Sequence, residues 1–198
     1  MEGKTRDGIA NSDRSIMLEC MKRLRLVLPL LVLAVGLALS LPGCGVFFGG
    51  GTAAARSLRD DVRVSWLRCQ VSGRRDGACA WDNIQQAASG RAAWRSCYQN
   101  APGGSVRLDG RMLRGMRRLL SRGYSFRVTS LAGASHGRQS LHYAGLAFDI
   151  DTLNGKRISR SHPEWREFLA DCRELGATET MGPGDPGHAT HLHVAWAP

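Results

Sequence analysis

The sequence predicts an α+β domain in which helices pack on one side of a small, mainly antiparallel sheet. Apolar residues recur with the helical period in 109–123 and 161–176, which predicts two amphipathic helices. They alternate with polar residues in 124–130, 146–151 and 190–196, which predicts three strands. The 198-residue chain shows no internal repeat and is long enough for one domain with a core.

The first helix is expected to begin after Asp109 and to end at Gly123. An aspartate in that position can cap the free N–H groups of the first turn, and a glycine readily ends a helix. The apolar face consists of Met112, Leu113, Met116, Leu119 and Leu120. The opposite face carries a row of arginines, which we interpret as a solvated surface rather than a nucleic-acid reader: Arg111, Arg114, Arg117, Arg118 and Arg122.

The second helix is expected to begin at Ser161, because Ser161 and Glu164 have the spacing of a capping box. It should end at Gly176. Its inward residues are Trp165, Phe168, Leu169, Cys172 and Leu175.

The region before these elements is less regular. Residues 45–56 are rich in glycine and alanine, which predicts a tether, and 57–104 form a subregion with three tryptophans, three cysteines and a candidate helix over 82–93. We expect the tryptophans to pack in the core, with a wall-binding surface as the alternative. Residues 105–198 would then form a second unit, which contains the helices and strands described above.

Residues 1–44 have the composition of an export signal. A basic run at 21–25 precedes an apolar run at 26–41, and Leu41-Pro-Gly-Cys44 follows. These last four residues resemble the lipobox of bacterial lipoproteins, so Cys44 is expected to carry a lipid anchor in the cell envelope. A transmembrane anchor and plain secretion are the alternatives, and Met17 or Met21 could be the true start.

We expect the protein to be a monomer.

The predicted export bears on whether the cysteines form disulfides. Four cysteines follow Cys44, and an even number in an oxidising compartment predicts two disulfides, with free thiols as the alternative. The pairing is left open among Cys69, Cys79, Cys97 and Cys172.

The chain is strongly basic, with a formal net charge of +10. From Gly45 onward it still has 21 Lys and Arg against 13 Asp and Glu. Such an excess favours nucleic acid, anionic lipid or acidic wall polymers as surroundings. Export and the lack of a nucleic-acid-binding motif argue against nucleic acid as a partner.

Side chains that can bind metal gather in two stretches, 140–151 and 188–193. Because side chains alternate along a strand, Asp149 should point away from the apolar face, as should His193 on the last strand. If these two strands are neighbours, then His142, Asp149 and His193 can meet around one ion on the open face of the sheet. Two imidazoles and a carboxylate suit Zn²⁺ and leave a fourth position for water.

The motif Ser140-x-His142-x-x-Gly145-x-Ala147-x-Asp149, followed by His188-x-x-His191-x-His193, resembles a known superfamily. It comprises lysostaphin-type enzymes, D-Ala-D-Ala metallopeptidases and Hedgehog domains, and the D-alanyl-D-alanine carboxypeptidase-like branch is the most similar. The resemblance covers about 106–196. It implies that His142, Asp149 and His193 bind zinc, that Ser140 lies near the bound peptide, that His191 assists proton transfer and that His188 supports the transition state.

Two positions depart from the family pattern. Thr190 stands where dipeptidase-like members have a glutamate base, so the role of the base falls to His191, with Glu179 and Asp185 as alternatives. No arginine follows the strand at 130–133, where many members use one to stabilise the oxyanion. Candidates for that role are Arg127, Arg138 and His136.

The sequence therefore predicts an exported zinc peptidase that acts on peptidoglycan stem peptides, as a D,D-carboxypeptidase or an endopeptidase. The alternative is a non-catalytic, zinc-stabilised binding module on the cell surface.

Overall fold

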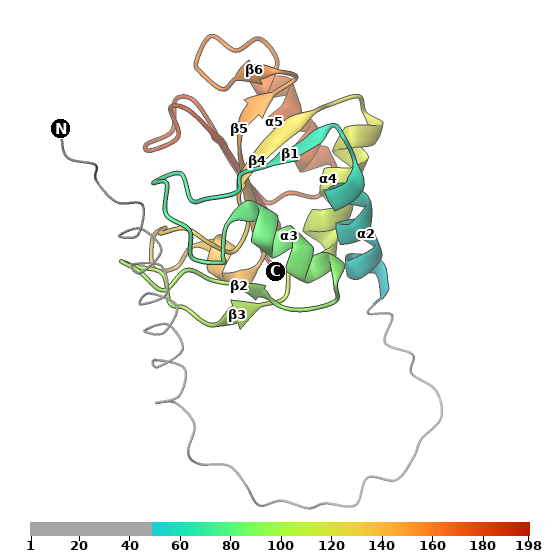
Figure 1. Cartoon of the computed structure of the whole chain (residues 1–198). Coiled ribbons are helices and arrows are strands. Elements are labelled where there is room, and N and C mark those ends of the chain that lie inside the picture. The colour runs from blue at the N-terminus through green and yellow to red at the C-terminus, as the bar shows by residue number, and fades with distance from the viewer. Residues whose placement is uncertain (1–48) are drawn as a thin grey trace, which may run out of the picture.

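The computed structural model describes residues 49–198, so the predicted export signal and Cys44 lie outside the described residues. Four α-helices and a mixed sheet make up this part of the chain (Figure 1). The α+β class predicted from the sequence is confirmed. None of the helices in residues 49–198 has the length and apolar character needed to cross a membrane.

A six-stranded sheet lies at the centre. Its order is β1 (Val64–Trp66), β4 (Phe126–Ser130), β5 (Ala147–Leu153), β8 (Leu192–Ala195) and β7 (Glu179–Met181), and β6 (Lys156–Arg157) pairs with β5. β1 runs parallel to β4, whereas the other pairs are antiparallel. Two shorter strands, β2 (Ala93–Trp94) and β3 (Ser105–Val106), pair separately. Three-residue strands such as β1 and β7 are too short to show alternation in the sequence.

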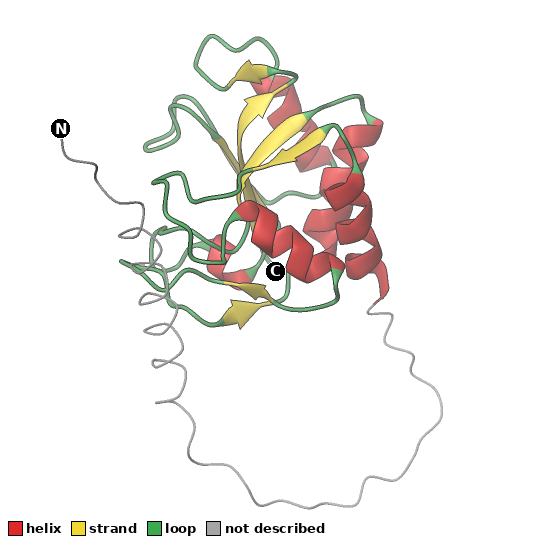
Figure 2. Cartoon of the chain, viewed as in Figure 1, coloured by secondary structure: helices red, strands yellow, loops and turns green. Residues whose placement is uncertain are grey.

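The helices cover the apolar face of the sheet (Figure 2). They are α2 (Gly49–Asp60), α3 (Ala80–Ala88), α4 (Gly110–Ser121) and α5 (Trp165–Glu174). Each contributes buried residues to one core that also contains Phe148 and Ile150 of β5 and Val194 of β8. The polar residues of these strands therefore project from the opposite face. Trp66 and Trp81 pack on this core as expected, and Trp94 is exposed.

The tether predicted for 45–56 is wrong for the residues from Gly49 onward, which form the first two turns of α2. Ala54, Ala55 and Leu58 of this helix are buried. Because the buried face consists mainly of alanine, the apolar periodicity in the sequence is weak. Packing against α3 and α4 stabilises this helix, as tertiary contacts do for most helices in proteins.

The two predicted helix starts have different outcomes. Asp109 caps α4 as expected, and its carboxylate accepts a hydrogen bond from the Arg111 backbone N–H at 2.6 Å. The capping box predicted at Ser161 is wrong, because α5 begins at Trp165. The Glu164 carboxylate accepts a hydrogen bond from the Asn154 side chain, so it does not reach back to the helix start.

The two predicted disulfides stay a prediction, since the described residues show none. Cys79 and Cys172 are buried thiols that form no disulfide in the described structure. Cys79 Sγ donates a hydrogen bond to the Asp82 carboxylate at 2.7 Å, and burial together with this carboxylate raises the pKa of Cys79 to about 12. Cys172 belongs to the apolar core beneath α5.

Candidate metal centre

Three of the predicted site residues meet on the polar face of the sheet. Asp149 on β5 and His193 on β8 are direct register partners in adjacent antiparallel strands. His142 lies on a single 3₁₀ turn, η1 (Leu141–Ala144), which is capped by the Ser140 hydroxyl. His142 Nε2, Asp149 Oδ1 and His193 Nδ1 form a triangle with sides of 3.0, 2.8 and 3.1 Å. All three side chains are buried.

Each imidazole also bonds a group outside the triangle, which we call its outer partner and which fixes the orientation of the ring. His142 Nδ1 donates to the Leu131 carbonyl oxygen at 2.6 Å, and His193 Nε2 donates to Glu179 Oε1 at 3.0 Å. Such partners fix the tautomer of metal-binding histidines. The remaining nitrogens, His142 Nε2 and His193 Nδ1, therefore face the Asp149 carboxylate.

The three facing atoms need positive charge among them, either a proton on an imidazole or a bound cation. Three acceptor atoms within 3.1 Å repel one another unless a proton or a cation lies between them. Burial alone would raise the pKa of Asp149, but positive charge and hydrogen bonds from protonated His142 and His193 outweigh burial and hold it well below its usual range. The carboxylate therefore stays ionised and available as a ligand.

The triangle has dimensions close to those of a zinc site. With bonds of about 2.0–2.2 Å, ligand atoms in a tetrahedral site lie roughly 3.3–3.6 Å apart. The sides of 2.8–3.1 Å approach these values, so small movements of the side chains would bring all three atoms to bonding distance of one ion. Two imidazoles and one carboxylate form a donor set that suits Zn²⁺.

His136, His142 and Asp149 form a second set of possible metal ligands, since their ligand atoms lie within 4.8 Å of one another. Its ring stacks on that of His142 with centroids 3.9 Å apart, and its Nε2 is engaged by Gly133 O and Ser130 Oγ. Burial lowers the pKa of His136 to about 4, so the ring is neutral. We favour His193 as the third ligand because its Nδ1 lies 2.8 Å from Asp149 Oδ1 and 3.1 Å from His142 Nε2, whereas His136 Nε2 already contacts Gly133 O.

An open cavity of about 490 Å³ lies over the triangle. Its lining includes three further predicted site residues, Ser140, His188 and His191. The rings of His188 and His191 have centroids 4.7 Å apart. Burial lowers the pKa of His191, so its imidazole is neutral at pH 7 and can accept a proton. These residues are therefore placed where a bound substrate would contact them.

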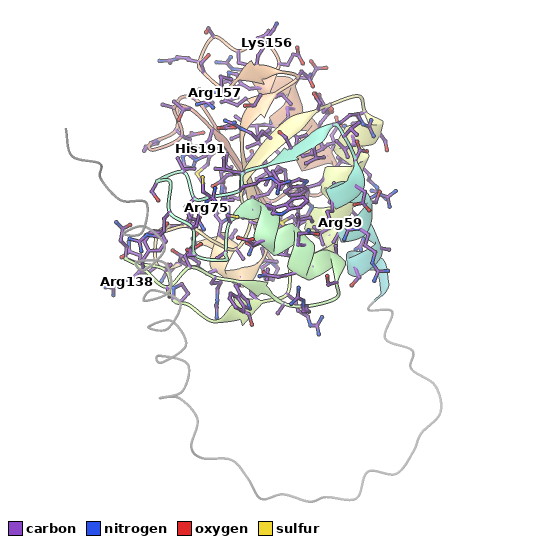
Figure 3. All side chains as sticks on the ribbon, in the orientation of Figure 1. Arg59, Arg75, Arg138, Lys156, Arg157 and His191 are labelled. Carbon is purple, nitrogen blue, oxygen red and sulfur yellow. The ribbon has the colours of Figure 1, made fainter. Side chains whose placement is uncertain are left out.

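The two predicted arginines do not reach this cavity. Arg127 forms two hydrogen bonds to the Asp151 carboxylate on the neighbouring strand, which occupies its guanidinium group. Arg138 is exposed on the loop before η1 and does not line the cavity. Figure 3 shows Arg138 at the edge of the molecule, away from His191. Neither arginine is placed to stabilise an oxyanion at the triangle.

The alternative bases also have other roles. Glu179 orients His193, as described above, and the exposed Asp185 accepts a hydrogen bond from the Gly182 backbone N–H at 2.8 Å. His191 is therefore the best placed of the candidate bases.

The Arg127–Asp151 pair gives a prediction for acid stability. Burial alone would raise the pKa of Asp151, but hydrogen bonds from Arg127 outweigh burial and lower it. The stabilisation that this ion pair gives the folded state is therefore fully present above the unfolded pKa of about 3.9. It is lost as the pH falls through the lower pKa of Asp151 in the folded state. We expect Asp151→Asn to reduce the free energy of unfolding by about 1 kcal/mol at pH 7. The difference should shrink below about pH 4 in urea titrations, and a pH-independent difference would contradict the assignment.

The subregion 57–104 fixes the loop that carries the outer partner of His142. Asn83 Oδ1 accepts a hydrogen bond from the Ala132 backbone N–H at 2.8 Å, and Ser96 Oγ accepts one from Ala134 N at 2.9 Å. The Leu131 carbonyl oxygen that bonds His142 belongs to this loop. No sequence pattern indicates this role, because Asn83 lies 49 residues from its partner.

Gly133 lies between these two anchor points, and it gives a second stability prediction. A Cβ atom at this position would lie 1.8 Å from the Ala78 carbonyl oxygen, so backbone must move to accommodate it. We expect Gly133→Ala to lower the free energy of unfolding by about 3 kcal/mol in chemical denaturation. Gly137→Ala is the matched control, because a Cβ there meets nothing within 4 Å. Equal stability of the two variants would show that the loop is not held as described.

Glu179 provides a test of the outer partners. Removing such a partner typically costs about 10–100-fold in metal affinity. We expect this loss for Glu179→Ala, measured by competition with a chromophoric chelator. Glu179→Gln keeps an oxygen that can accept the His193 hydrogen bond, so it should lose less. Unchanged affinity in Glu179→Ala would mean that Glu179 does not orient His193.

Comparison of the chain with protein-family models, curated proteins and solved structures gave no match. The motif resemblance described above therefore remains a prediction.

Proposed function

We propose that this chain is a zinc-dependent peptidase that hydrolyses peptidoglycan stem peptides in the cell envelope. The observation that carries the proposal is the inward-facing triangle of His142, Asp149 and His193, with sides of 2.8–3.1 Å, beneath an open cavity. This triangle supports a zinc site on the face of the sheet opposite the helices. The substrate class and the location rest on the motif resemblance and on the predicted export signal.

The residues around the cavity support hydrolysis of an amide. When bound, zinc supplies a Lewis acid that polarises the carbonyl group and lowers the pKa of a coordinated water. The neutral imidazole of His191 accepts a proton from the attacking water and returns it to the leaving amine. His188, beside His191, is the candidate for stabilising the developing negative charge. Ser140 and Gln139 in the lining offer hydrogen bonds to the bound peptide.

The experiment is to incubate the purified full chain with muropeptides that end in D-Ala-D-Ala. Released D-Ala or cleaved stem peptide is identified by mass spectrometry. We expect hydrolysis that a chelator abolishes and that added zinc restores. The absence of any metal-dependent product would overturn the proposal.

One observation favours a second candidate, a non-catalytic, zinc-stabilised binding module. No arginine lines the cavity within the described residues, so a group that stabilises the oxyanion in many related enzymes is missing there. A binding module would retain zinc and the cavity but would not turn over any muropeptide.

A further inference from the structure

A second cavity, of about 300 Å³, lies where α2, α4 and the turn after α3 meet. Four exposed arginines line it: Arg91, Arg107, Arg111 and Arg114. None of its lining residues is shared with the cavity over the metal triangle. This arginine cavity is therefore a separate feature of the molecule.

The positive charge of the arginine cavity is only partly neutralised. Asp109 is the one carboxylate among its described lining residues, and it pairs with Arg111 at 2.9 Å. Within residues 49–198, no ion pair engages Arg91, Arg107 or Arg114. Like charges gathered around a concave surface create a strong positive potential, and a bound anion relieves their repulsion.

The chemistry and size of the cavity favour a phosphate group. The planar guanidinium fork matches two phosphate oxygens at once, which makes arginine the preferred residue for this anion. A volume of about 300 Å³ is at the lower end for ligand pockets, so it accommodates a headgroup rather than a long polymer.

The place of the cavity in the chain indicates the source of this phosphate. Gly51 forms part of its wall, seven residues after Cys44, the predicted site of lipid attachment. Seven residues span at most about 25 Å when fully extended. The anchor would therefore keep the arginine cavity close to the bilayer surface, where anionic headgroups attract basic residues.

We infer that the arginine cavity binds the phosphate of an anionic phospholipid headgroup and so fixes the orientation of the domain on the membrane. The inference uses the predicted lipid attachment at Cys44 but does not depend on the proposed peptidase activity. A lipid anchor alone leaves the domain free to rotate about its attachment point. A second contact through the arginines removes that freedom.

The test uses the full chain in a maltoside detergent and isothermal titration calorimetry. The probes are dihexanoyl-phosphatidylglycerol, dihexanoyl-phosphatidylcholine and inorganic phosphate. One variant combines Arg91→Gln, Arg107→Gln and Arg114→Gln. The matched control removes the same charge from exposed arginines outside the cavity, with Arg117→Gln, Arg118→Gln and Arg160→Gln. Circular dichroism checks folding, and zinc content checks that the metal triangle is unaffected.

We expect phosphatidylglycerol to bind more tightly than the other two probes. The Kd should rise at least tenfold in the cavity variant and less than threefold in the control. If the triple variant does not fold, each single substitution should still raise the Kd about threefold. The inference is overturned if phosphatidylglycerol does not bind, if inorganic phosphate binds as tightly, or if the control loses as much affinity as the cavity variant.

Discussion

Asp149→Asn is expected to lower zinc affinity by about a hundred- to a thousandfold. The free energy of binding structural zinc is roughly 10–16 kcal/mol, so each of four positions contributes about 2.5–4 kcal/mol. Asparagine preserves the shape of the side chain but removes the charge that faces both imidazoles. Competition with a chromophoric chelator measures the change in Kd.

Asp151→Asn is the matched control for this experiment. Asp151 lies two residues further along β5, but its carboxylate is paired with Arg127 and Arg157 rather than with the histidines. Its zinc affinity should stay within about threefold of the native value. If both variants lose the metal equally, the carboxylate of Asp149 has no special role as a ligand.

His191→Ala is expected to lower kcat on muropeptides by about a hundred- to ten-thousandfold, the usual contribution of general acid–base catalysis. Zinc affinity should be nearly unchanged, because His191 is not one of the three atoms in the triangle. Single-turnover assays with a zinc-loaded chain measure the effect.

Thr190→Ala serves as the control, because Thr190 is exposed and does not line the cavity. It should keep native turnover. A His191→Ala variant with full activity would show that another group takes the proton. The absence of activity in both the native chain and the variant, with zinc bound, would favour the binding module.

The parts of the site that follow local rules were predictable from the sequence. Strand alternation placed Asp149 and His193 on the polar sides of their strands, with Phe148 and Val194 facing the core. The sequence could not show that β5 and β8 are neighbours, because strand order is a property of the whole sheet. The structure places the two residues directly opposite each other.

The outer partners of the histidines lay beyond sequence reasoning. His142 is oriented by a backbone carbonyl, that of Leu131, which any residue could supply. His193 is oriented by Glu179 on the three-residue strand β7, which is too short to show a pattern. The sequence indicates Glu179 only as a candidate base, because it shows the chemistry of a side chain but not which groups the side chain contacts.

The wrong predictions share a cause, because each took composition as a guide to contacts. A Gly/Ala-rich segment was interpreted as a tether, yet alanines can form the buried face of a helix when neighbouring helices approach closely, as in α2. Arg127 carries suitable charge for an oxyanion, but the nearby Asp151 engages it first.

The most direct test of the metal centre is anomalous diffraction at the zinc edge from crystals of the zinc-loaded chain. We expect one strong peak about 2.0–2.2 Å from His142 Nε2, Asp149 Oδ1 and His193 Nδ1. A peak bonded to His136 instead of His193, or no peak at the triangle, would contradict the account.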